Sequence, residues 1–125
     1  MDRIEQTYSV LTVSAADKFS ASLHTLLPEG QYDPVRAVRD AASARRLLLE
    51  QSFDIVIVNA PLPDEFGTQL ALELSETSGA GVLLLVKAEQ YAELSARLTP
   101  NGILTLQKPT TPQLLTQTLQ LLCGT

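Results

Sequence analysis

The feature that most constrains the fold is a short apolar run, residues 54–58, that leads directly into a proline-containing loop. The run reads DIVIV, and the loop after Asn59 contains Pro61, Pro63 and a closing Gly67. Runs of β-branched residues bounded by turn residues are typical of strands buried on both faces, as in a parallel sheet. Because ligand sites in such sheets lie just beyond the carboxyl ends of the strands, Asn59 is predicted to lie at the functional edge.

The remainder of the chain repeats this alternation of strand and helix. Strands are predicted at residues 8–13, 34–38, 54–58, 82–86 and 103–106, with a segment of helical spacing after each. The predicted helix N-caps are Asp17, Asp40 and Thr111. The short links imply right-handed βαβ units around one parallel sheet with strand order 2-1-3-4-5. Ser14 and Asn59 are then expected to face each other across one crevice.

The length and composition fit a small acidic domain. The 125 residues are expected to form a single domain, residues 1–125, and a hydrophobic content of 45% is enough for a buried core. A net charge of −5 gives no general attraction for nucleic acid or anionic membranes. Cys123 is the single cysteine, which agrees with a reducing compartment. No signal peptide or membrane span is visible, so a cytoplasmic location is expected.

The spacing from Asn59 through Pro63 to Gly67 resembles the loop after the third strand of response-regulator receiver domains. The resemblance covers essentially the whole chain, and it implies a flavodoxin-like (CheY-like) doubly wound α/β fold with five strands and five helices. In that family, an aspartate after the third strand accepts a phosphoryl group and binds Mg²⁺ together with two acidic residues after the first strand. A hydroxyl residue and a lysine at the ends of the fourth and fifth strands contact the acyl phosphate.

The resemblance places residues of different chemistry at most of these positions. The phosphoacceptor position is Asn59, the acidic pair falls on Ser14 and Ala15, the hydroxyl and aromatic switch positions fall on Val86 and Thr105, and the retained lysine is Lys108. A neutral amide is a poor nucleophile towards phosphorus, and Mg²⁺ without a carboxylate keeps its water ligands. We therefore expect a degenerate receiver, a pseudo-receiver, that is not an enzyme and uses no metal or cofactor. The alternative is an atypical phosphoacceptor that uses a displaced carboxylate.

Two lysines are expected near Asn59. Lys108 is expected to donate to the Asn59 side-chain oxygen, or else to hold the following loop, whose prolyl peptide bond is usually cis in this family. Lys87 is expected either to pair with Asp64 or Glu65 or to be an ordinary surface lysine. A second candidate function is therefore a small-anion or ligand pocket lined by Lys87 and Lys108.

Three other polar side chains are assigned to solvated positions. Arg45 and Arg46 are expected on the solvated side of the second helix. His24 is expected to be a partly exposed residue of the first helix, because nothing places a second metal ligand beside it.

The last helix contains more leucine than one buried face requires. Leu115, Leu119 and Leu122 form one stripe, and Leu114 and Leu121 form a neighbouring one. One stripe is expected to cover the sheet, and the other is either a contact face, part of a wide core-facing stripe or the start of a helix that continues beyond the last residue. We name Leu115, Leu119 and Leu122 as the candidate interface. Receivers often dimerise through the fourth helix, fifth strand and fifth helix, which makes a homodimer the expected assembly.

Residues 61–67 and 82–89 resemble, more narrowly, the N-terminal receiver of ANTAR-type antitermination regulators. In those proteins a coiled coil and a small RNA-binding helical domain follow the receiver. The resemblance implies a regulatory domain of a response regulator from a two-component or phosphorelay system. It also implies an output domain beyond residue 125 that this domain controls. The segment itself is not expected to bind RNA.

Overall fold

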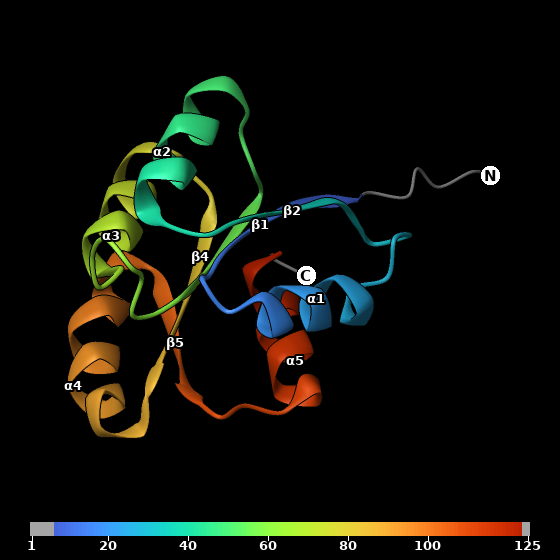
Figure 1. The fold of residues 1–125 in the computed structure, drawn as a ribbon. Coiled ribbons are helices and arrows are strands. Elements are labelled where there is room, and N and C mark those ends of the chain that lie inside the picture. The colour runs from blue at the N-terminus through green and yellow to red at the C-terminus, as the bar shows by residue number, and fades with distance from the viewer. Residues whose placement is uncertain (1–6, 124–125) are drawn as a thin grey trace.

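Five parallel strands form one sheet in the order β2-β1-β3-β4-β5, and helices cover both of its faces (Figure 1). The computed structural model describes residues 7–123. Along the chain the elements are β1 (Tyr8–Val13), α1 (Asp17–Leu26), β2 (Tyr32–Val38), α2 (Ala41–Glu50), β3 (Ile55–Asn59), α3 (Thr68–Thr77), β4 (Gly81–Lys87), α4 (Ala88–Leu98), the 3₁₀ turn η1 (Thr99–Asn101), β5 (Ile103–Lys108) and α5 (Pro112–Leu122). This topology confirms the predicted doubly wound fold with five strands and five α-helices.

The sheet divides the core into two layers, because successive side chains of a strand point to opposite faces. On one face Val56, Val58 and Leu84 pack with α2, α3 and α4. On the other face Ile57 and Leu85 pack with α1 and α5, and Figure 1 shows these two helices together on that side. Burial on both faces explains why the central strands are continuous apolar runs.

Three strands extend to polar residues that the sequence analysis placed in the following loops. Asn59, Lys87 and Lys108 are the last residues of β3, β4 and β5. Each of them pairs with a residue of an adjacent strand in the sheet: Asn59 with Leu85, and Lys87 with Lys108. The direction of each of these side chains is therefore fixed by the sheet.

The helix starts were predicted correctly for two of the three proposed caps. The side chain of Asp40 accepts from the Ser43 N–H at 2.8 Å, and that of Thr111 accepts from the Leu114 N–H at 3.1 Å. The prediction for Asp17 was wrong, because Asp17 is the first residue of α1 and pairs with Arg39. Between residues 7 and 123, no helix has the length and apolar character needed to cross a bilayer.

The two leucine stripes of α5 have opposite environments. Leu115 and Leu119 are buried against the sheet, and Leu122 packs at the edge of the same cluster. This stripe is therefore part of the core, and its burial does not fit its assignment as the candidate interface. The exposed leucines of α5 are Leu114 and Leu121, at 44% and 69% relative exposure.

Candidate functional site

Four polar residues meet at the carboxyl edge of the sheet. Asn59, Lys87 and Lys108 each lie two positions after a residue whose side chain faces α1 and α5, so the alternation of the strands directs them to that same side. Ser14 directly follows β1 and is buried. The crevice predicted between Ser14 and Asn59 is thus present at the switch point between β1 and β3.

A chain of hydrogen bonds connects three of these residues. The Nζ of Lys108 donates to Oδ1 of Asn59 at 2.8 Å and to the carbonyl oxygen of Ala60 at 2.5 Å. The Nδ2 of Asn59 donates to Oγ of Ser14 at 3.0 Å, and that oxygen also accepts from the Ala16 N–H at 3.0 Å. The predicted bond between Lys108 and Asn59 is confirmed. The Lys108–Pro109 peptide bond is cis, as the resemblance implies.

The positive charge of Lys108 in this crevice is only weakly compensated by its neighbours. Burial lowers the pKa of Lys108, and the positive charge of the neighbouring Lys87 lowers it further. Asn59 and Ser14 are neutral, so they solvate the ammonium group without balancing its charge. The site therefore favours an anion and disfavours a second cation.

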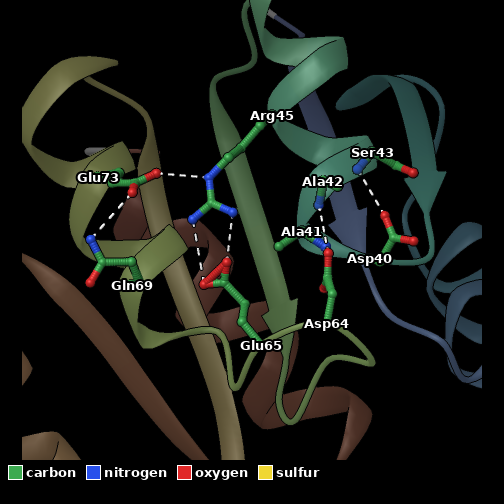
Figure 2. Close-up of polar contacts among 9 residues, drawn as sticks. All are labelled: Asp40, Ala41, Ala42, Ser43, Arg45, Asp64, Glu65, Gln69 and Glu73. Atoms are coloured by element: carbon green, nitrogen blue, oxygen red, sulfur yellow. Dashed lines mark hydrogen bonds and ion pairs between the residues drawn. The ribbon is translucent and has the colours of Figure 1, made fainter.

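The acidic residues of the β3–α3 loop are engaged elsewhere, as Figure 2 shows. The two carboxylate oxygens of Asp64 accept from the Ala41 and Ala42 N–H groups, at 3.0 Å each, at the start of α2. These hydrogen bonds lower the pKa of Asp64. Glu65 binds Arg45, and Lys87 is exposed. Of the two expectations for Lys87, the surface lysine agrees with the structure and the pairing with Asp64 or Glu65 does not.

Arg45 is the centre of an ion-pair network between α2, the β3–α3 loop and α3 (Figure 2). Its Nη1 lies 2.6 Å from a carboxylate oxygen of Glu65, and its Nε lies 2.9 Å from one of Glu73. These bonds raise the pKa of Arg45 and lower that of Glu73. The prediction of a solvated position was therefore wrong for Arg45, whereas Arg46 and His24 are exposed as expected.

The other positions carried over from the receiver pattern lack charged groups. Val86 is fully buried, and Thr105 is 7% exposed with a hydroxyl that has no hydrogen-bond partner among the described residues. Val86 and Ile103, two residues before Thr105, belong to the core layer on the α2–α3–α4 side, so neither Val86 nor Thr105 faces Asn59. Ala15 is half-buried and offers only a methyl group. Within residues 7–123, no three His, Cys, Asp or Glu side chains are grouped as a metal site would require.

A cavity that the sequence pattern did not predict lies on the side of the sheet covered by α1 and α5. It has a volume of about 900 Å³ and includes Lys108 in its lining. The apolar residues that form it were assigned to the core from their helical spacing. That spacing gives no information on how closely two helices approach one another, so no sequence signal would have revealed the cavity.

The arrangement of five parallel strands, flanking helices and a polar edge at the switch point defines a receiver-type α/β domain, and comparison with solved structures agrees. The chain matches the signal receiver domain of an HD-domain-containing protein from Pseudomonas fluorescens Pf-5 at 25% identity and a TM-score of 0.80, covering 98% of this chain and 90% of that one. It matches the chemotaxis response regulator CheY4 of Vibrio cholerae at 22% identity and a TM-score of 0.79, covering 94% and 99%.

A third neighbour is a two-component response regulator from Clostridium difficile, with 15% identity and a TM-score of 0.81 over 95% of this chain and 97% of that one. No protein-family model and no curated protein matches the sequence. The chain therefore has the fold of response-regulator receiver domains, at 15% to 25% sequence identity to these three neighbours.

Proposed function

We propose that this chain is a regulatory receiver-type domain that does not accept a phosphoryl group. The observation that supports this most strongly is that both polar atoms of the Asn59 amide, which the family resemblance assigns to the phosphoacceptor position, are engaged in hydrogen bonds. Its oxygen accepts from Lys108 and its nitrogen donates to Ser14. An amide held in this way has neither the charge nor the nucleophilicity of a carboxylate.

The donor set also does not fit Mg²⁺. A hard divalent cation requires oxygen ligands with negative charge, and the crevice offers a hydroxyl, an amide and a lysine ammonium group. Asp64, the nearest alternative carboxylate in the loop, is committed to the N-terminus of α2.

Intact-mass measurement after incubation with acetyl phosphate and Mg²⁺ tests the proposal. We expect no phosphate adduct on this protein, while a receiver domain with an intact aspartate, treated in parallel, acquires one. An adduct on the unmodified chain would overturn the proposal and favour a displaced phosphoacceptor. The variant Ser14→Asp/Ala15→Asp/Asn59→Asp introduces carboxylates at the three positions that are acidic in the receiver pattern. A phosphate adduct on this variant would show that the lack of these carboxylates is sufficient to prevent phosphorylation of the unmodified chain.

The signal in this proposal is a partner or ligand that shifts the population between two packings of the α4–β5–α5 face. The narrower resemblance suggests an RNA-binding ANTAR output domain after this segment, in a cytoplasmic antitermination regulator. The sequence of the complete gene product tests that assignment directly. A downstream segment without a helical RNA-binding domain would exclude an ANTAR output domain. It would not exclude a regulatory role for residues 1–125.

We further propose that the domain forms a homodimer in which the exposed leucines of α5 take part. Leu114 and Leu121 are the exposed large apolar side chains of this helix within the described residues. Light scattering over a range of concentrations should show a dimer for the unmodified chain and a monomer for Leu114→Glu/Leu121→Glu. Leu49→Glu, at an exposed position on α2, is the matched control and should leave the dimer unchanged. A concentration-independent monomer would exclude this assembly.

A second candidate function is binding of a small anion at Lys87 and Lys108. The two lysines are cross-strand neighbours, and the effect of Lys87 on the pKa of Lys108 shows that they share one electrostatic environment. Titration with phosphate, sulfate or a cyclic dinucleotide should shift the amide resonances of both lysines. Unchanged resonances would exclude this function.

A further inference from the structure

The cavity on the α1–α5 side of the sheet has the size and lining of a small-molecule site. Its volume of about 900 Å³ lies within the range of roughly 300–1,000 Å³ that is typical of ligand pockets. The apolar part of the lining comes from α1, from Leu85 of β4 and from Leu115 of α5. Leu85 and Leu115 are buried in the core, so this wall is set by the packing of the sheet and the helix.

The polar residues of the cavity lining come from two places: Ser22 and Thr25 on α1, and the end of β5 with the loop before α5. Lys108, Thr110 and Thr111 contribute to the lining from β5 and this loop.

The charge of the cavity lining is positive. Lys108 is the charged residue among those that line it, and no carboxylate is in the same lining. An ammonium group has three N–H donors, and two of them serve Asn59 and Ala60. One N–H donor of the Lys108 ammonium group therefore remains beyond these two bonds.

We propose that this cavity binds an amphipathic carboxylate, with its apolar body between α1 and α5 and its carboxylate at Lys108. The apolar walls would contact the hydrocarbon body of such a ligand, and Lys108 at the end of β5 would contact its carboxylate. A carboxylate there would also compensate the positive charges of Lys108 and Lys87. Lys108 would then bond both the ligand and the Asn59 amide, which couples the cavity to Asn59.

This inference goes beyond the proposed function and does not depend on it, since the cavity can be occupied whether or not Asn59 accepts phosphate. Decanoate is a suitable probe. Titrated into the isotope-labelled protein, it should cause saturable shifts in the methyl groups of Leu26 and Leu115 and in the amide of Thr110. Decanol, which has the same chain without the charge, should bind at least about tenfold more weakly because it loses the ion pair.

Two matched variants on α1 locate the site. Ser22 lines the cavity and is exposed, so Ser22→Phe should fill part of it and weaken decanoate binding by about tenfold or more. His24 is exposed on the same helix and is not part of the lining, so His24→Phe should leave the affinity within about twofold.

Three results would overturn the inference. The first is the absence of shifts at the cavity residues up to the solubility limit of decanoate. The second is equal binding of decanol, which would show that Lys108 does not select the head group. The third is a set of cavity resonances that respond to protein dilution and not to decanoate, which would identify a second copy of the chain as the occupant. None of these results bears on the acetyl phosphate experiment, so the two proposals fail independently.

Discussion

The ammonium group of Lys108 donates to the amide oxygen of Asn59 at 2.8 Å, although the two residues are 49 positions apart in the sequence. This bond joins the ends of β5 and β3 across β4, which lies between them in the sheet. Because the amide is neutral, the bond solvates the ammonium group and leaves its charge uncompensated. The charge state of Lys108 is therefore a sensitive readout of this site.

Replacing Asn59 by aspartate should raise the pKa of Lys108. The new carboxylate would stand where the amide oxygen now accepts from Nζ, and an opposite charge at that distance favours the protonated lysine. An NMR titration of the Lys108 side chain measures the change, with exposed Lys18 as the internal reference. An unchanged or lower pKa would show that residue 59 and Lys108 do not interact in solution.

Removing the charge of Lys87 should also raise the pKa of Lys108. The positive charge of Lys87 is the second cause of the lowered value, after burial, so Lys87→Met should return the pKa only part of the way to its ordinary value. The same titration tests this, and Lys18→Met is the control. A pKa restored completely by Lys87→Met would contradict the assignment of burial as the larger cause.

Arg45→Met should destabilise the fold by about 1 kcal/mol, because it removes the partner of both Glu65 and Glu73. Urea denaturation measures the change in the free energy of unfolding. Arg46→Met is the matched control, since Arg46 is exposed and its guanidinium group donates to the Ser43 hydroxyl within its own helix. It should cost less than about 0.5 kcal/mol. The difference between the two variants should shrink in about 1 M salt, and equal losses would argue against the network.

Asp64→Asn should weaken the acid dependence of stability. The pKa of Asp64 is lowered in the folded state, so its contribution is complete above the unfolded pKa of about 4 and is lost as the pH falls through the lower folded value. The variant should therefore be less stable than the unmodified chain at neutral pH and approach it in strong acid. Denaturation midpoints across pH test this, with Asp33→Asn at an exposed position of β2 as the control. A difference that is constant with pH would contradict the capping role.

Gly67→Ala should destabilise the fold by about 2 kcal/mol or more. Gly67 has φ of +126°, and an added Cβ would lie 2.9 Å from Cγ1 of Val58 in the central strand. Gly30→Ala is the control, because a Cβ at Gly30 meets nothing within 4 Å. Thermal or urea denaturation compares the two, and similar stabilities would show that the β3–α3 loop can relax.

Most of the fold could be predicted from the sequence because its elements depend on local patterns. The run after Phe53 predicts a doubly covered strand, and Asp40 and Thr111 predict helix starts through caps that act over three residues. The bond between Lys108 and Asn59 was expected from the family resemblance, and the structure contains it. The ends of the strands were less accurate, because ladder pairing extends β3, β4 and β5 to residues with no strand signal of their own.

The sequence by itself determined the alternation of strands and helices and the presence of a neutral amide at position 59. The tertiary structure decided that Arg45 binds Glu65 and Glu73, that Asp64 caps a helix 22 or more residues away, and that Leu115 is buried while Leu121 is exposed. The physical reason is that hydrophobic periodicity and capping act within a few residues. Ion pairs, cavities and exposed faces depend on the distances between elements that pack together from distant parts of the chain.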